Sequence, residues 1–444
     1  KANRLNPQDS RVLNKLFDVN LALGDMKEAL ALAENILRVN PHHARARLMM
    51  AGKAFHQKDA AAAVSHADMI LSDDAERVVG NMIALWGGKQ AGDEALYMPA
   101  LVALENETNF SGPAMRNMAL FHEYLGDKER SNDIHETVIK DHGLRSVNQV
   151  LDYLFFLHRV GNLERRDVFF NNIGGQNEHH AIYRHIKPLL EQAPTPLDIS
   201  GAQGLAHGLL EIADTADLQN KPREQLIYIH MANWIDPASR RGMMTLADAL
   251  ADLTLLDEAI DTYTPIRNDL IFGETVRASI ALLHEANDNP DKAIELLQYE
   301  VDTSDSLFSM KIIADMLRRQ EKYLEAEVHY TSIVERIGEA EKHDWEVFYG
   351  RGIVRERLGN WPGAEADLLI AKDLSGDRPY VLNYLGYSWI DNGENVEQGL
   401  AMVERAVQAE PNNGYFVDSL GWAFYRLGEF QKAVKLLEHA TMLQ

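Results

Sequence analysis

The chain has no cysteine in its 444 residues. This absence excludes disulfide bonds, thiolate nucleophiles and cysteine-ligated zinc together. It suits an exported bacterial protein that needs no bridges. We therefore expect a periplasmic location, with the cytoplasm as the alternative.

Long hydrophobic runs are also missing. The most apolar stretch, Val78 to Gly88, is too short to cross a bilayer and contains Asn81, so we expect no transmembrane segment. No signal peptide is visible. Because the sequence begins at Lys1, inside what looks like the end of a helix, we expect that an export signal or lipid anchor was removed upstream.

Basic residues are scarce in the second half of the chain. Residues 1 to 200 carry 22 basic and 26 acidic side chains, whereas residues 201 to 444 carry 22 and 41. Such an acidic surface repels phosphate backbones, so we expect no nucleic-acid partner. A basic protein or peptide is the natural charge complement, and a solvated surface that keeps the molecule monodisperse is the alternative.

The sequence has no cluster that suggests a metal or nucleotide site. His179, His180 and His185 are too irregularly spaced to share one helix face, unlike the pair in zinc helices. The glycines at 201, 204 and 208 lack the lysine of a phosphate-binding loop and the preceding strand of a dinucleotide site, so they predict close helix packing. We expect no metal and no cofactor.

Catalytic motifs are absent as well. The segment Asn287–Asp291 resembles a calcium loop in composition, but it lacks the glutamate at the twelfth position and predicts a turn, with Asn289 before the proline that starts a helix. No nucleophile-elbow sequence is present. We expect no catalytic residues and no enzymatic activity.

What the chain does have is a repeat. Gly352, Gly386 and Gly421 lie 34 and 35 residues apart, and each sits in a pattern of two helices joined by a turn. Small residues follow on the second helix and recur seven positions later, which keeps one narrow stripe against the neighbouring helix; they are Ala364, Ala371, Ala406, Ala433 and Ala440.

The turns of the repeat carry residues that end helices. Gly359, Gly393 and Gly428 stand between the two helices of a unit, where glycine supplies the positive φ of a helix carboxyl end. Pro379 and Pro411 mark the turn into the next unit, because proline cannot prolong the preceding helix.

The same period extends towards the amino end. Ala259, Ala293 and Ala326 are spaced by 34 and 33 residues, and Pro7 and Pro41 are 34 apart. The units that contain Gly126 and Gly161 keep the glycine that ends the first helix but have Ser131 and Arg166 where a small residue is expected, so the repeat is degenerate after about residue 78. This pattern resembles the tetratricopeptide repeat. The resemblance implies an all-α, right-handed α-solenoid of about 11–12 helix-turn-helix units.

A break interrupts the repeat between Asn171 and Gly204. Paired glycines and the prolines 194 and 196 lie there, with a helix expected at about 178 to 191. Two explanations remain open, a junction between two sub-solenoids or one eroded repeat with a long loop. Both predict an amino-terminal solenoid at 1–195 and an acidic carboxy-terminal solenoid at 196–444.

The inner surface of the last three units is unusually aromatic. In tetratricopeptide arrays the second, fifth, ninth and twelfth positions of each first helix face the groove, and here these positions also include Glu346, Ile353, Glu356 and Ile390. We predict a partner-binding stripe of Tyr349, Tyr380, Asn383, Tyr387, Tyr415, Asp418, Trp422 and Tyr425. Asn383 is placed to bond a peptide backbone. The alternative is that individual rings pack between successive helices.

Resemblance narrows the function further. The lysines and asparagines with which some tetratricopeptide domains clamp a terminal carboxylate are absent from the clear units. The segments Asn383–Asp391 and Val417–Gly428 resemble the end of bacterial exported tetratricopeptide proteins, including outer-membrane lipoprotein adaptors for carboxy-terminal processing proteases. This implies a periplasmic, outer-membrane-associated adaptor that recruits a protease or its substrates. The alternative is an accessory subunit of a cell-envelope or polysaccharide-synthesis enzyme complex.

Overall fold

The computed structural model describes residues 10–70, 75–108, 111–173 and 181–443, and over these residues the chain is helical and has no strand. The predicted all-α repeat architecture is confirmed. Apart from α11, the described α-helices follow one another as the first and second helices of twelve helix-turn-helix repeats. The chain divides into two compact units, residues 1–283 and residues 284–444.

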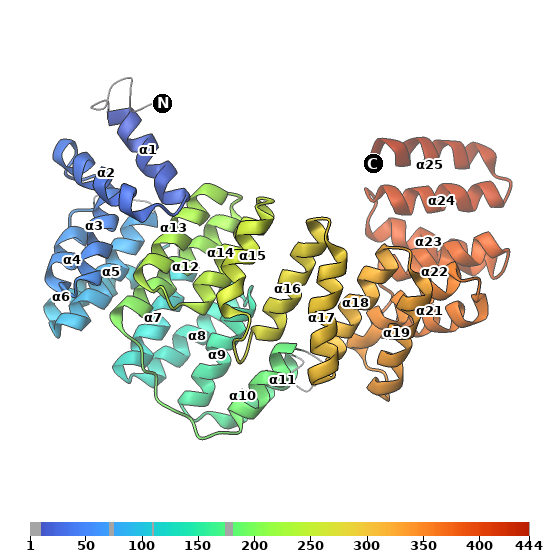
Figure 1. Ribbon diagram of the computed structural model, residues 1–444, viewed down its shortest axis with the longest axis horizontal. Coiled ribbons are helices and arrows are strands. Elements are labelled where there is room, and N and C mark those ends of the chain that lie inside the picture. The colour runs from blue at the N-terminus through green and yellow to red at the C-terminus, as the bar shows by residue number, and fades with distance from the viewer. Residues whose placement is uncertain (1–9, 71–74, 109–110, 174–180, 444) are drawn as a thin grey trace. The chain divides into compact units, whose positions relative to one another are not determined.

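Unit 1 is coloured blue to yellow in Figure 1. Its helices are α1 (Ser10–Ala22), α2 (Met26–Val39), α3 (Ala44–His56), α4 (Ala60–Ala67), α5 (Ala75–Ala91), α6 (Glu94–Glu105), α7 (Ser111–Leu125), α8 (Lys128–His142), α9 (Val147–Arg159), α10 (Leu163–Asn172), α11 (Ala181–Leu190), α12 (Gly201–Leu218), α13 (Pro222–Ile235), α14 (Arg240–Asp252), α15 (Leu256–Tyr263), the 3-10 turn η2 (Thr264–Ile266) and α16 (Gly273–Ala286), which ends just past the boundary.

Unit 2 continues in amber to red. It contains α17 (Pro290–Ser304), α18 (Leu307–Arg319), α19 (Tyr323–Ile337), the 3-10 turn η3 (Lys342–Asp344), α20 (Trp345–Arg357), α21 (Trp361–Ser375), α22 (Pro379–Asn392), α23 (Val396–Ala409), α24 (Gly414–Arg426) and α25 (Phe430–Leu443). The start of α17 at Pro290, directly after Asn289, confirms that Asn287–Asp291 is a turn that leads into a helix.

The helices of unit 2 end where the sequence predicts. Gly359, Gly393 and Gly428 have φ of +77°, +73° and +78°, a conformation that costs other residues strain. The predicted small residues of the second helices are buried, and they include Ala364, Ala371, Ala406, Ala433 and Ala440.

Helices α22 and α23 approach each other closely at a pair of glycines. A Cβ atom on Gly386 would lie 2.6 Å from the carbonyl oxygen of Gly399, and one on Gly399 would lie 2.7 Å from that of Gly386. The two backbones therefore touch directly at this pair. The repeat glycine is required here by backbone contact with the partner helix.

Unit 1 differs from a simple array because α12 and α13 return onto its earlier helices. Helix α12 packs on α5 and α7, and α13 packs on α1 and α3 (Figure 1). All four are first helices of their units, and first helices line the inner side of such an array. The inner side of the amino-terminal repeats is thus filled by residues 201–235.

The glycines of α12 permit this packing. A Cβ on Gly204 would lie 2.3 Å from the ring of Trp86, and one on Gly208 would lie 2.5 Å from Met82 Sδ. Trp86 Nε1 donates to Asn117 Oδ1 at 3.0 Å, and Asn117 Nδ2 donates to the carbonyl of Gly204 at 2.9 Å. The prediction that this glycine run serves close helix packing is confirmed.

The degenerate units keep their helices by other means. The buried Ser131 donates its hydroxyl to the carbonyl of Ala119 at 2.8 Å, and Arg166 donates to the carbonyl of Leu190 at 2.8 Å. Helix α11 lies inside the range expected for it. His179, His180 and the paired glycines 174 and 175 lie outside the described residues, and the division at residue 195 stays a prediction.

Candidate functional site

The predicted stripe lies on the three first helices α20, α22 and α24. We call the following set the aromatic groove: Tyr349, Tyr380, Asn383, Tyr387, Tyr415, Asp418, Trp422 and Tyr425. Tyr380, Tyr415 and Tyr425 are 53%, 74% and 48% exposed, and Asp418 is exposed as well. Tyr349, Asn383, Tyr387 and Trp422 are half-buried. None of the eight belongs to the buried core, so each keeps surface for a partner.

Rings from neighbouring helices meet along the groove. The ring of Tyr349 on α20 contacts that of Tyr384 on α22 edge to face, with centroids 5.8 Å apart. Tyr380 meets Phe416 of α24 in the same way at 5.2 Å. These contacts fix the orientation of both tyrosine rings, so a partner that binds them pays little entropy to order them.

Trp422 and Tyr425 form the end of the groove on α24. Their rings stack with centroids 5.3 Å apart. Trp422 Nε1 donates to Asp391 Oδ1 at 3.2 Å, and Arg426 donates to the same oxygen at 2.7 Å. Asp391 therefore holds the indole by its edge, while one face of the indole is stacked on Tyr425.

Asn383 carries an unused hydrogen-bonding atom. Its Oδ1 is buried and accepts no hydrogen bond from the described residues. A buried acceptor without a partner costs free energy, commonly 1–3 kcal/mol. A ligand N–H reaches this buried oxygen only if the Asn383 side chain turns outward, and the new bond then removes this cost.

Acidic groups surround the centre of the groove. Burial raises the pKa of Tyr387, and the carboxylates of Asp391 and Asp418 raise it further while Arg357 opposes them. Burial likewise raises the pKa of Tyr349. Both phenols stay protonated at neutral pH, and the field at Tyr387 favours a cationic neighbour.

The preceding first helix, α18, is charged at the corresponding positions. Lys311 Nζ lies 2.9 Å from Asp315 Oδ2 and 2.8 Å from Glu346 Oε2, and Arg318 Nε is 3.4 Å from Tyr330 Oη. These cations are already paired. They do not form a carboxylate clamp.

Two residues depart from the sequence-based stripe. Ile390 is 1% exposed and packs in the core with Val403, so it does not face the groove. Tyr384 was missed, although it contacts Tyr349 and donates its hydroxyl to Glu356 Oε2 at 3.1 Å. Tyr384 lies one position after Asn383. A ring contact between two helices leaves no pattern in the sequence of a single repeat.

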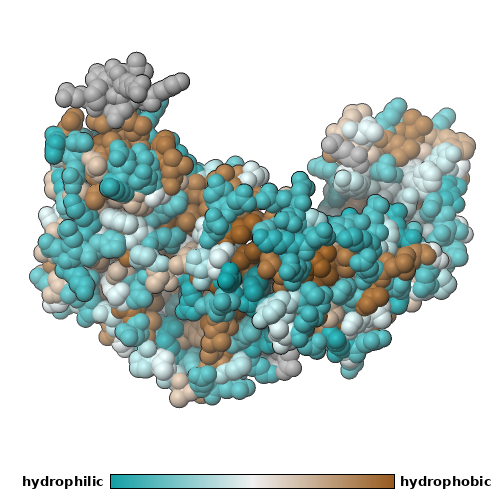
Figure 2. Space-filling view, in the orientation of Figure 1, coloured by the Kyte–Doolittle hydropathy of each residue, from teal (hydrophilic) through white to brown (hydrophobic). Residues whose placement is uncertain are grey.

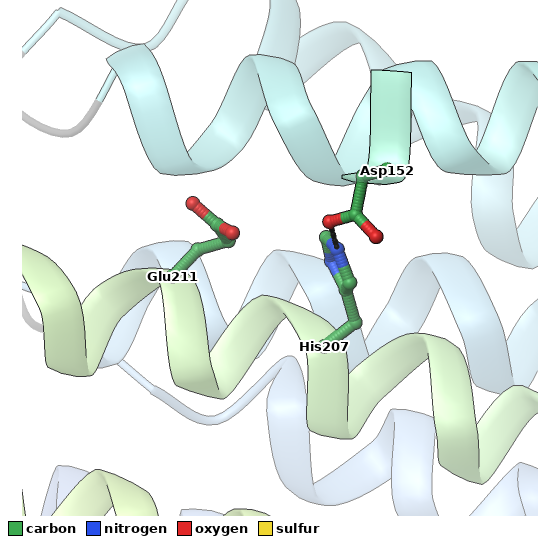
Figure 3. Close-up of side chains that lie close together, drawn as sticks. All are labelled: Asp152, His207 and Glu211. Carbon is green, nitrogen blue, oxygen red and sulfur yellow. Dashed lines mark hydrogen bonds and ion pairs between the residues drawn. The ribbon is translucent and has the colours of Figure 1, made fainter. Parts of the chain in front are cut away.

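A second group of polar residues lies inside unit 1, separate from the groove. Asp152 of α9 points toward His207 of α12, and Glu211 follows one turn later on α12 (Figure 3). His207 Nε2 is 3.1 Å from Asp152 Oδ2, and the three residues offer ligand atoms within 4.8 Å of one another. Residue types alone would allow a metal here.

Guanidinium groups pair with these carboxylates instead. Arg241 donates to Glu211 Oε1 at 2.6 Å and lies 3.5 Å from Asp152 Oδ2, while Arg116 donates to Glu211 Oε2. Burial alone raises the pKa of Glu211, but the charges of Arg241 and Arg116 outweigh it and the pKa is lowered. A divalent cation would meet two fixed positive charges, so the geometry fits an ion-pair network that joins α7, α9, α12 and α14.

None of the described helices is both long and apolar enough to cross a membrane. Apolar side chains do reach the surface, and Figure 2 shows them over the last two helices. On α25, Phe430, Val434 and Met442 are 59%, 53% and 78% exposed. They lie on a second helix, and the ring of Phe430 contacts that of Tyr425 in the aromatic groove with centroids 5.7 Å apart.

Comparison with known proteins agrees with the repeat. Residues 20–84 match the tetratricopeptide repeat family. The chain is 27% identical over 97 residues to the TPR repeat-containing protein PA4667 of Pseudomonas aeruginosa, and the match covers 22% of this chain and 16% of that protein. The shared part is thus a small fraction of the relative.

Solved structures with a similar arrangement include the Cut9 and Hcn1 hetero-tetramer of the APC/C, which is 12% identical with a TM-score of 0.42 and covers 94% of this chain and 96% of that one. YrrB, described as a TPR protein with an unusual peptide-binding site, is 17% identical with a TM-score of 0.28 and covers 49% and 92%. A monomeric mutant of IFIT1 is 12% identical with a TM-score of 0.35 and covers 83% and 100%. At these identities the likeness concerns the fold.

Proposed function

We propose that this tetratricopeptide-repeat chain is a non-enzymatic scaffold or adaptor, and that an extended segment of a partner protein binds in its aromatic groove. The observation that carries the proposal is a row of half-exposed rings beside the unpaired Oδ1 of Asn383. The aromatic rings supply contact area, and the side-chain oxygen of Asn383 supplies an acceptor for a backbone N–H of the partner. Main-chain bonds with side-chain pockets are a recurrent mode of peptide recognition.

Charge favours a basic occupant. Unit 2 carries 16 Lys and Arg against 29 Asp and Glu, a net charge of −13. Asp418 is exposed in the groove, and Asp391 and Glu356 lie beside Tyr387. Lysine or arginine side chains over Tyr387 and Trp422 would combine ring and carboxylate contacts.

The test uses a fluorescein-labelled peptide of alternating lysine and leucine, with a glutamate and leucine peptide for comparison. Anisotropy should show binding of the basic peptide and much weaker binding of the acidic one. Tyr387→Ala with Trp422→Ala should weaken binding by about 30-fold or more, because one aromatic hot-spot residue commonly contributes about 2 kcal/mol and the contributions of neighbouring residues are not additive.

The matched control is Tyr299→Ala. Tyr299 is 66% exposed on α17, a second helix of the same unit, and should be neutral. If the double variant binds as tightly as the control, the groove is not the site. Circular dichroism separates the two roles of the rings, since a loss of cooperative unfolding would show that they act in packing.

A finer proposal follows from the resemblance of residues 383–428 to exported adaptors. On that basis the partner is a periplasmic protease or its substrate, and the chain is held at the outer membrane by a lipid. A second candidate is an accessory subunit of an envelope or polysaccharide-synthesis complex, in which the acidic half of the chain docks a basic catalytic subunit.

Affinity capture from a cell-envelope extract distinguishes these candidates. A protease recovered by the wild type but not by the Tyr387→Ala, Trp422→Ala variant supports the adaptor, whereas synthesis enzymes recovered in that way support the accessory subunit. Turnover of a substrate by the purified chain alone would contradict both.

A further inference from the structure

Unit 1 contains a cavity whose lining differs in charge from that of four other cavities among the described residues. It has a volume of 540 Å³ and lies where the carboxyl ends of α3, α5 and α7 meet the amino end of α12. We call it the basic cavity. A volume of this size is typical of pockets that hold small molecules.

The basic cavity is positively charged within an acidic chain. Lys58 and Lys89 line it, and no Asp or Glu does. Four other cavities each include two carboxylates, such as Asp214 and Asp217 in one of them. Neither lysine pairs with a carboxylate of the described residues, and the one recorded neighbour of Lys89 is the ring of Tyr124, 6.0 Å away.

The lining of the cavity combines apolar side chains with the polar side chains of His56, Gln90 and Ser200. Phe55, Trp86 and Ile235 form its floor and are 4%, 1% and 6% exposed. The ring of Tyr124 lies against Trp86 with centroids 5.6 Å apart. This floor accepts a flat apolar group, while the lysines at the rim accept a negative charge.

A purely structural role for the lysines is the competing explanation. Lys89 lies in the last turn of α5 and Lys58 just after α3, where a cation complements the helix dipole. That role accounts for their charge. It does not account for a cavity of 540 Å³ that both lysines line.

We propose that the basic cavity binds a small aromatic anion, a ring that carries a carboxylate or a phosphate group. The ring lies on Phe55 and Ile235, and the anionic group lies between Lys58 and Lys89. This site is in unit 1 and does not depend on partner binding in the aromatic groove.

The test follows the fluorescence of 8-anilinonaphthalene-1-sulfonate, an aromatic sulfonate, on the full chain. Lys58→Gln with Lys89→Gln should weaken its binding by about tenfold or more, because bonds to charged groups contribute over 1.4 kcal/mol. The control is Lys15→Gln with Lys27→Gln, which removes the same charge from exposed positions of α1 and α2 and should leave binding unchanged. Equal effects of the two double substitutions would overturn the proposal, because the affinity of dye bound elsewhere depends only on the net charge of the chain.

A second variant leaves both lysines in place. Ala202→Leu extends a side chain from the first turn of α12 into the basic cavity and should also weaken dye binding, because it takes up the volume that the ring needs. If it binds like the wild type, the proposal fails. Competition then identifies the anionic group: displacement by phenyl phosphate indicates a phosphate and displacement by benzoate a carboxylate. Displacement by neither overturns the proposal.

Discussion

Replacing Gly386 with alanine tests how the best-preserved repeats are held together. Its new Cβ would lie 2.6 Å from the carbonyl oxygen of Gly399, a backbone atom that cannot turn away. At Gly421 the nearest atoms are Cγ and Cδ2 of Leu437, 2.8 and 2.9 Å away on a half-buried side chain, and the nearest backbone atom is the Leu437 nitrogen at 3.2 Å. The same substitution therefore meets backbone 2.6 Å away at one repeat and mainly a side chain at the other.

The expected magnitudes follow from two opposing effects. Glycine to alanine inside a helix gains about 1 kcal/mol of helix propensity. Overpacking a close contact costs about 1–3 kcal/mol, and contact with backbone belongs at the upper end. Gly386→Ala should thus destabilise α22 and α23 by about 2 kcal/mol, whereas Gly421→Ala should be within about 1 kcal/mol of neutral.

Hydrogen exchange measured by mass spectrometry is the suitable assay, because a repeat array opens locally and a single unfolding free energy is poorly defined. Peptides from α22 and α23 should exchange at least about tenfold faster in Gly386→Ala. The Gly421→Ala variant should leave α24 and α25 near wild type. Equal effects at the two glycines, or none at Gly386, would refute the reasoning from backbone contact.

Further predictions concern unit 1 and the helix ends. Glu211→Gln should lower the local stability of α12, measured by hydrogen exchange, by about 3–5 kcal/mol, because it removes the buried carboxylate that Arg116 and Arg241 share. Arg130→Gln, at a half-exposed pair with Glu105, should cost about 1 kcal/mol or less. Burial lowers the pKa of His135 from 6.5 to about 4, so the unfolded state takes up the proton first and stability should fall as pH drops from 6.5 to 4. The melting temperature of His135→Gln should lack this fall between pH 6.5 and 4. A pH dependence equal to that of the wild type would refute the prediction. Gly428→Ala, at φ +78° with open space around it, should cost about 1 kcal/mol through backbone strain alone.

The repeat architecture was predictable because its signals are local. A glycine with positive φ, such as Gly428, and a buried alanine seven residues from another, such as Ala433 and Ala440, follow from the conformation of one unit. Every unit repeats the same local requirement. The period therefore survives in the sequence even where individual residues change.

The filling of the inner side of unit 1 was not predictable. A repeat pattern reports contacts between adjacent units, whereas Gly204 of α12 meets Trp86 of α5, more than a hundred residues earlier. The glycine run indicated that a close neighbour exists. Only the three-dimensional arrangement identifies that neighbour as the first helices of the amino-terminal repeats.

The aromatic groove was predictable in part. The spacing along each first helix placed Tyr380 and Tyr415 at the surface but also assigned Ile390 to the groove, where the approach of α23 buries it. Tyr384 was missed because its role depends on a ring of another helix. The side of a helix on which a residue lies follows from the helical period, whereas its contacts with other helices depend on the local packing.

The most direct test of the account is photo-crosslinking of the labelled lysine and leucine peptide to the full chain. Benzoylphenylalanine is placed at Tyr415 in the aromatic groove, which is 74% exposed, and in parallel at Tyr299 on α17, which is 66% exposed. If the partner binds in the aromatic groove, position 415 should give adducts that unlabelled peptide suppresses, and position 299 should give few. Equal yields at the two positions would contradict a partner-binding groove on the first helices of unit 2.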